Sequence, residues 1–257
     1  IEMLVYRAEK PETGNFTSSS FGRNKYVGFD IEIAKNIVGD FTNWRSNRPL
    51  GITCAAHYPE GDQPTLWYDT DPQGNPTPKM SSKYACHLVT ALMDWVKKGY
   101  QILTWNGLGF DFDVLAEESN MWDECRNLAL THVDMMFHFF CLKGYTLGLE
   151  KAAKGMGLSG KLAGVSGEQA PVLWQQGQYM KVLEYVEQDS RTTVDIAEAV
   201  EKRGYLAWTS NSGNFQRADF PNGWLTVEQA SNLPLPDISW MKNPIRRNQF
   251  LAWINIK

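Results

Sequence analysis

Two acidic residues, Asp30 and Glu32, lie two positions apart in a segment of alternating character, YVGFDIEIA. This alternation predicts a β-strand over residues 26–34. Side chains two residues apart on a strand lie on the same face, so the two carboxylates can share one divalent cation. An exposed strand face that is acidic by chance gives the same pattern, and this pair alone does not separate the two interpretations.

A third acidic residue, Asp111, comes five positions after Asn106, where a predicted strand ends and a predicted helix begins. In open α/β sheets, ligands usually bind at this carboxyl edge of the strands. The alternative is that Asp111 caps the helix while Asn106 and the neighbouring glycines only form the turn. Asp113 is expected to point away from Asp111 and to have a capping or solvated role.

The fourth acidic residue, Asp189, comes four positions after Tyr185 within a predicted helix over residues 179–203. Residues four apart lie on the same face of a helix, so the phenol and the carboxylate can address one site. An ordinary half-buried pair would show the same spacing. Each of the three segments is therefore weak evidence by itself, and their order and combination carry the hypothesis.

The elements that would position these residues follow from hydrophobic periodicity. Strands over residues 50–58 and 65–68 follow the first strand and indicate an antiparallel meander of three. An amphipathic helix over residues 81–98 leads to a short apolar run at residues 100–105, which is typical of a buried parallel strand. A helix is then expected from about residue 111 to 119.

Further along the chain, we predict a strand over residues 131–135 and helices over residues 147–155 and 179–203. Three early strands followed by alternating helices and strands indicate an α/β fold, with a mixed sheet and helices packed on it. We expect an N-terminal arm at residues 1–24, the main domain at residues 25–203 and a C-terminal appendage at residues 204–257. A capping-box pattern at Thr226 predicts one helix in that appendage.

Composition limits the class of protein. The 257 residues, 43% of them hydrophobic, can bury the core of one larger α/β domain. The net charge of −4 and the pI near 5.6 lack the basic signature of a protein that coats nucleic acid. A nuclease is compatible with these values because clustered carboxylates that hold metal ions lower the pI.

The four cysteines lie far apart, with no Cys-x-x-Cys pair for zinc and no dense framework for disulfides. No apolar run approaches the roughly 20 residues that cross a bilayer, and the first residues lack a signal-peptide pattern. We therefore expect a cytoplasmic protein without a membrane partner.

Taken together, the acidic segments resemble the three exonuclease motifs of the DEDD (DnaQ-like) superfamily, in its tyrosine-containing branch. The motifs are Phe29-Asp30-Ile31-Glu32, Asn106-x-x-x-Phe110-Asp111 and Tyr185-x-x-x-Asp189. They are most similar to those of the proofreading exonuclease domain of family B DNA polymerases and its stand-alone relatives. The resemblance covers about residues 25–203. The histidine branch has His five positions before the last Asp, and Glu184 at that position disfavours it.

The resemblance implies a ribonuclease H-like fold, with a mixed five-stranded sheet of three antiparallel strands and then parallel strands. Helices are expected on both faces of this sheet, with the C-terminal appendage added. It also implies two divalent cations, Mg²⁺ or Mn²⁺, as cofactors. The implied ligands are the four carboxylates of Asp30, Glu32, Asp111 and Asp189.

The activity implied is 3′–5′ exonuclease hydrolysis of nucleic acid with a free, single-stranded 3′ end, with DNA favoured over RNA, releasing nucleoside 5′-monophosphates. The four acidic residues and Tyr185 would be the catalytic set, with Tyr185 orienting the attacking water. Asn106 and Phe110 would bind the terminal nucleotide. A protein partner in replication, repair or nucleic-acid processing is a further expectation.

Two other interpretations remain open. One is a catalytically silent ribonuclease H-like module that binds a partner or nucleic acid. The other is a metal-dependent phosphodiesterase that acts on small nucleotides. A complete set of four acidic residues with Tyr185 argues against the first, because a binding module needs no such set.

Overall fold

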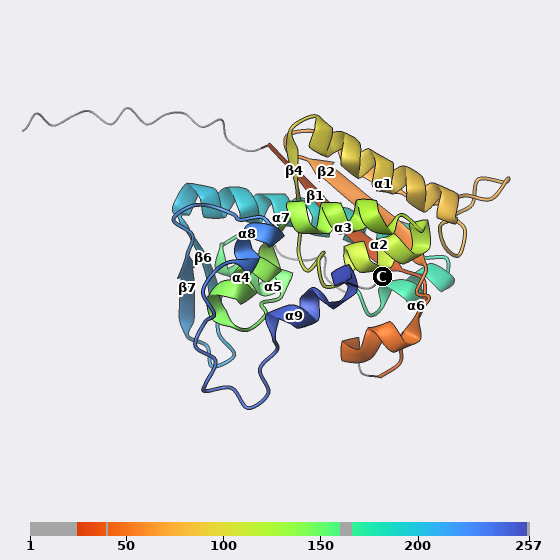
Figure 1. Cartoon of the computed structure of the whole chain (residues 1–257). Helices are drawn as coiled ribbons and strands as arrows, with labels where there is room; N and C mark the ends of the chain where they lie inside the picture. Colours follow the sequence, from red (N-terminus) through yellow and green to blue (C-terminus); the bar gives the residue numbers. More distant parts are fainter. Residues whose placement is uncertain (1–24, 40, 160–165, 256–257) are drawn as a thin grey trace, which may run out of the picture.

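A computed structural model describes residues 25–39, 41–159 and 166–255 of this chain. Five strands form one mixed sheet in the order β3-β2-β1-β4-β5 (Figure 1). The pairs β1–β2 and β2–β3 are antiparallel, and the pairs β1–β4 and β4–β5 are parallel. The predicted mixed five-stranded sheet is therefore confirmed. Its strands are β1 (Lys25–Ile33), β2 (Ile52–Pro59), β3 (Thr65–Trp67), β4 (Tyr100–Thr104) and β5 (Val133–Asp134).

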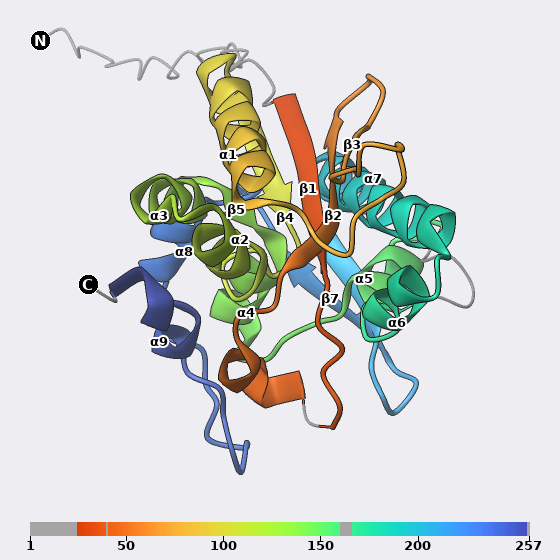
Figure 2. The ribbon, with the colours of Figure 1, turned by 90° about the vertical axis from the view of Figure 1, so that its right-hand side faces the viewer.

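Helices cover both faces of the sheet, as predicted. In Figure 2, α1, α2 and α3 lie on one side of β1 and β4, and α5, α6 and α7 lie on the other. The helices named here are α1 (Ser82–Lys97), α2 (Asp111–Ser119), α3 (Trp122–Thr131), α5 (Leu149–Gly155), α6 (Ala170–Gln175) and α7 (Tyr179–Arg203).

The central strand β1 is buried on both faces, and its residues alternate between them. Val27, Phe29 and Ile31 belong to the apolar cluster beneath α1 and α2. The other face, with Gly28, points toward α7. Since Asp30 and Glu32 have the same parity as Gly28, the two-residue period places them on the α7 side.

Gly28 allows α7 to approach β1 unusually closely. A Cβ atom added at this position would lie 2.1 Å from the backbone oxygen of Ser190, which is well inside van der Waals contact. The Ser190 hydroxyl also donates to the Ala56 carbonyl on β2 at 3.2 Å. Because residue 28 has no side chain, α7 with Asp189 can lie close to β1 with Asp30 and Glu32.

The structure differs from the sequence-based prediction around β5 and the helix that follows it. The strand expected over residues 131–135 is only Val133–Asp134, because α4 (Met135–Lys143) begins directly after it. Asp134 ends the strand by capping α4, its side chain accepting from the Phe137 amide at 2.9 Å. Residues 135–141 of α4 are all buried, so this helix has no polar face and no amphipathic period to reveal it.

The segment after α7 begins with a hairpin of β6 (Tyr205–Thr209) and β7 (Phe215–Asp219). The capping box at Thr226 starts α8 (Val227–Ser231), as predicted. The described part of the segment ends with α9 (Arg247–Phe250) and the 3-10 helix η2 (Ala252–Asn255). Within η2, the indole of Trp253 donates to the Leu108 carbonyl at 2.7 Å. This segment therefore contacts the loop before α2.

The proposed domain boundaries remain a prediction, and the expected N-terminal arm lies outside the described residues. Within the described ranges, no helix has both the length and the apolar character that crossing a membrane requires.

Candidate functional site

One cavity of about 360 Å³ brings together residues from three distant parts of the sequence. It lies where the C-terminal part of β1, the β4–α2 turn and α7 meet. All seven residues singled out from the sequence line it: Asp30, Glu32, Asn106, Phe110, Asp111, Tyr185 and Asp189. The structure thus places them in one site, while their chemical roles stay a prediction.

Asp111 is hydrogen-bonded directly to β1, the strand that carries Asp30 and Glu32. Its Oδ1 atom accepts a hydrogen bond from the backbone N–H of Ile31 at 3.1 Å, between the two acidic residues of β1. Asp111 is the first residue of α2 and is 4% exposed. Burial, followed by the nearby carboxylates of Asp134 and Asp189, raises the pKa of Asp111 well above its usual range.

On the opposite wall, α7 presents Tyr185 and Asp189, both buried. A Cβ atom added at Gly167 would lie 3.9 Å from the Tyr185 hydroxyl oxygen and 4.0 Å from Glu32 Oε2. The phenol and the Glu32 carboxylate therefore border the same small space beside Gly167.

The phenol of Tyr185 is held in its protonated form. Burial raises its pKa well above its usual range, and the carboxylates of Asp189, Glu32 and Asp30 raise it further. A hydrogen bond to Asp189 acts in the same direction. Tyr185 can therefore donate a hydrogen bond in this site but is a poor general base.

The turn before α2 is held by Asp134, a residue that was not among those singled out. One of its oxygens accepts from the Asn106 amide at 3.0 Å and the other from the Leu108 amide at 2.9 Å. Asn106 has a positive φ of 82°, so the turn needs such anchoring. Burial raises the pKa of Asp134 to about 6, although these backbone donors oppose the effect. An acidic residue just before a helix is the sequence signal that could have revealed it.

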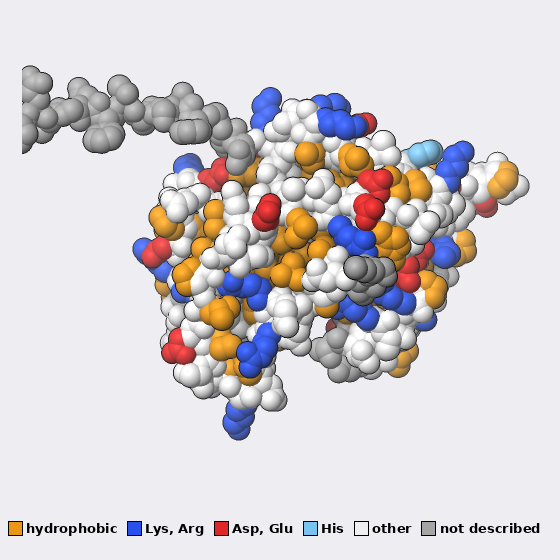
Figure 3. All heavy atoms as spheres, in the orientation of Figure 1, with side chains coloured by type: hydrophobic (Ala, Val, Ile, Leu, Met, Phe, Trp, Pro, Cys, Tyr) orange, Lys and Arg blue, Asp and Glu red, His pale blue; other side chains and the backbone are white. Residues whose placement is uncertain are grey.

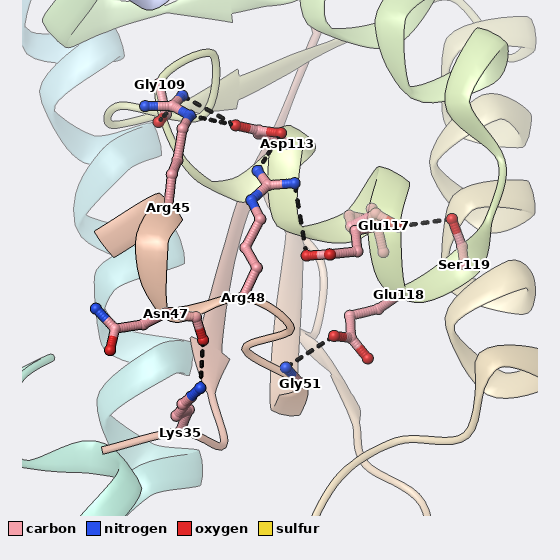
Figure 4. Close-up of polar contacts among 11 residues, drawn as sticks. Lys35, Arg45, Asn47, Arg48, Gly51, Gly109, Asp113, Glu117, Glu118 and Ser119 are labelled. Carbon is pink, nitrogen blue, oxygen red and sulfur yellow. Dashed lines mark hydrogen bonds and ion pairs between the residues drawn. The ribbon is translucent and has the colours of Figure 1, made fainter. Parts of the chain in front are cut away.

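Asp113 does not have the capping or solvated role that the sequence suggested. Its side chain is fully buried and lies between two guanidinium groups (Figure 4). Arg45 Nη2 is 2.9 Å from Asp113 Oδ2, and Arg48 forms an ion pair with Asp113 Oδ1. Arg45 belongs to the 3-10 helix η1 (Phe41–Asn47), so the cluster ties η1 to the first turn of α2. Asp113 is buried because η1, which is distant in the sequence, packs against it. The sequence pattern around Asp113 could not show this contact.

The loop before α5 forms a further wall of the cavity that sequence reasoning missed. It contributes Thr146, Leu147 and Gly148. The indole of Trp105, at the end of β4, donates to the Leu147 carbonyl at 2.8 Å and holds this loop against the sheet. No side-chain chemistry marks the loop in the sequence, because it contributes mainly backbone and shape.

The donor chemistry of the cavity fits a hard divalent cation. All four candidate ligands are carboxylates, and oxygen ligands suit Mg²⁺ and Mn²⁺. No described residue lining the cavity is Lys or Arg, so a bound cation would supply the positive charge that these acids lack. Among the described residues, no three acidic, histidine or cysteine side chains are close enough to hold an ion as they stand.

The surface agrees with the absence of a basic signature in the composition. On the face shown in Figure 3, Lys and Arg side chains are interspersed with Asp and Glu and form no continuous basic area. Attraction for a phosphate backbone must therefore be local on this face.

A family model described as the RNase_H superfamily matches residues 73–201, about half of the chain. This protein belongs to the RNase H superfamily. The matched region includes Asp111, Tyr185 and Asp189, whereas Asp30 and Glu32 lie before it. No curated protein matches the sequence.

Among solved structures, the family B DNA polymerase from the hyperthermophilic archaeon Pyrobaculum calidifontis is similar, with a TM-score of 0.47 and 14% identity. The similarity covers 70% of this chain and 25% of the polymerase chain. The matched part of this chain thus spans about a quarter of the polymerase's length.

Proposed function

We propose that this RNase H superfamily protein is a two-metal-dependent 3′–5′ exonuclease of the tyrosine-containing DEDD branch. It would hydrolyse phosphodiester bonds at single-stranded 3′ ends, with DNA favoured over RNA, and release nucleoside 5′-monophosphates. One observation carries the proposal: four carboxylates and a tyrosine from distant segments line a single cavity. Nucleases of this superfamily typically use divalent metals, which is consistent with that set of oxygen ligands.

In this proposal, Asp30, Glu32 and Asp189 would hold one cation, and Asp30 and Asp111 would hold the second, directly or through water. Two such ions stabilise the attacking and leaving oxygens of an in-line displacement at phosphorus. The hydrogen bond from the Ile31 amide orients the Asp111 carboxylate toward β1, where Asp30 and Glu32 lie. The residues of this chain thus supply both the ligands and the support that fixes their spacing.

Tyr185 would orient the attacking water by hydrogen bonding. Its pKa is raised by burial and by three carboxylates, so proton abstraction by a phenolate is disfavoured. Asn106 and Phe110, on the wall formed by the β4–α2 turn, would position the terminal nucleotide. Asp134 supports this wall through the Asn106 and Leu108 amides.

The test uses single-stranded DNA and RNA labelled at either the 3′ or the 5′ end, with Mg²⁺ or Mn²⁺. A 3′–5′ exonuclease releases the 3′ label as a mononucleotide in the first turnover, while the 5′ label passes through a ladder of shortened chains. Asp30→Ala and Asp189→Asn should each lower the rate by at least about 100-fold, because each removes a cation ligand. Asp195→Asn is the matched control, since Asp195 lies on the same helix but outside the cavity.

Undiminished cleavage by Asp30→Ala, or cleavage with the metal chelated, would refute the mechanism. Full activity of Tyr185→Phe would remove only the proposed orienting role. Hydrolysis of small nucleotide esters without any hydrolysis of polymer would identify a small-nucleotide phosphodiesterase instead.

A further inference from the structure

A second, larger cavity of about 670 Å³ adjoins the one that holds the carboxylates. The two cavities share Thr146, Leu147 and Gly148 as a common wall. The hydrogen bond from the Trp105 indole to the Leu147 carbonyl fixes this wall to the end of β4. A polymer that leaves the first cavity over this wall therefore enters the second.

The lining of the second cavity differs in charge from that of the first. The β6–β7 hairpin supplies hydroxyl and amide side chains, and none of the described lining residues is acidic. Among the described lining residues, Lys151 of α5 is the one cation, and its ammonium group donates to Asn211 Oδ1 at 2.5 Å. This leaves two ammonium protons for another acceptor. In a protein with a net charge of −4, this stretch beside the acidic site is suited to a phosphate backbone.

Three aromatic residues also line this cavity: Tyr145, Trp208 and Trp240. The Tyr145 ring makes a T-shaped contact with each of the two indoles, at centroid distances of 6.5 Å from Trp208 and 6.3 Å from Trp240. Trp208 is buried, but Trp240 is 68% exposed. A large exposed indole braced by a tyrosine at the rim of a polar cavity is the arrangement on which an unpaired base can stack.

We propose that the second cavity binds the single-stranded nucleic acid leading away from the terminal nucleotide. Trp240 stacks on a base of this segment and Lys151 contacts a phosphate, while the amides and hydroxyls of the hairpin contact base edges and sugars. This subsite rests on the proposed exonuclease function. It also assigns a role in substrate binding to the segment that follows α7.

The experiment compares thymidine oligomers of two and eight nucleotides as substrates for the wild-type protein and for Trp240→Ala. The dinucleotide reaches only the first cavity. Stacking on an aromatic side chain contributes about 1–3 kcal/mol per base, so Trp240→Ala should raise KM for the octamer roughly 5- to 150-fold. Its kcat for the octamer, and both constants for the dinucleotide, should stay unchanged.

Phe215→Ala provides the matched control, because Phe215 is an aromatic residue of the β6–β7 hairpin that is 66% exposed, much as Trp240 is, but does not line the cavity. It should leave KM for both substrates unchanged. In addition, Lys151→Gln should lower the salt dependence of octamer binding by about 0.7 in the slope of log K against log salt, the value for one phosphate contact on a single strand.

The outcomes separate the two proposals. If the wild type cleaves neither substrate, the proposed function fails. If it cleaves the octamer and Trp240→Ala retains the wild-type KM, the subsite alone is overturned. An equal rise in KM for both lengths, or the same rise with Phe215→Ala, would also overturn it.

Discussion

Replacing Gly28 by alanine tests whether the close contact between β1 and α7 sets the geometry of the site. The added methyl group would lie 2.1 Å from the Ser190 backbone oxygen, whereas real Cβ atoms essentially never approach closer than 3.0 Å. A backbone oxygen cannot rotate away from the clash. The strand and the helix must therefore separate by about 0.9 Å, the difference between these two distances.

Two magnitudes follow from this displacement. Overpacking a core contact costs about 1–3 kcal/mol, so the free energy of unfolding should fall by this amount. The same shift moves Tyr185 and Asp189 away from β1, and a misplacement of about 1 Å lowers catalytic rates by about 100-fold. Activity should thus fall much further than the fraction of folded protein.

The assay pairs denaturant unfolding with the rate of mononucleotide release. Gly61→Ala is the control: Gly61 has a φ of +75° with open space around its Cβ position, so strain alone costs about 1 kcal/mol. That variant should lose stability without losing activity. Wild-type stability and activity in Gly28→Ala would refute the reasoning, since the helix would then not depend on this contact.

Three more predictions concern protonation, charge and metal. The indole N–H groups of Trp67 and Trp95 face the two ring nitrogens of His57, at 2.9 and 3.1 Å, and the neutral imidazole accepts from one of them. Burial, with a smaller effect of Lys98, lowers the pKa of His57 from 6.5 to about 4. As the pH falls, His57 is protonated in the unfolded chain before it is protonated in the folded protein, so acid lowers the free energy of unfolding of the wild type. The difference in this free energy between the wild type and His57→Gln should therefore shrink by about 1 kcal/mol between about pH 7 and 5.5. Parallel curves of stability against pH would contradict this. Asp113→Asn should lower the free energy of unfolding, measured in urea, by about 3 kcal/mol. This is the low end of the range for breaking a buried ion pair, and it applies because the arginine partners are partly exposed. An unchanged urea midpoint would contradict this prediction. Mg²⁺ at ten times its Kd should stabilise the wild type by about 1.4 kcal/mol in thermal unfolding, and equal stabilisation of Asp189→Asn would exclude that residue as a ligand.

Much of the secondary structure could be predicted because its signals are local. The helices α2 and α7 have the predicted bounds, and α7 ends at Gly204 in a left-handed conformation. In contrast, α3 and α4 were not predicted, and β5 is shorter than expected. For α4, burial of seven consecutive residues removes the amphipathic period on which such predictions depend.

The sequence by itself determined which residues could act together within each segment. The two-residue period of β1 puts Asp30 and Glu32 on one face, and the helical period of α7 does the same for Tyr185 and Asp189. These are consequences of backbone geometry over a few residues, so they need no knowledge of the rest of the fold.

Only the tertiary structure decided that the three segments share a cavity, because that depends on packing between residues that are far apart in the sequence. The Gly28–Ser190 contact, the hydrogen bond from Ile31 to Asp111 and the Asp134 support of the β4–α2 turn all join distant segments. The second cavity is of the same kind, since its wall and its hairpin come from separate parts of the chain. Local periodicity carries no information about such contacts, which arise only when the whole chain packs.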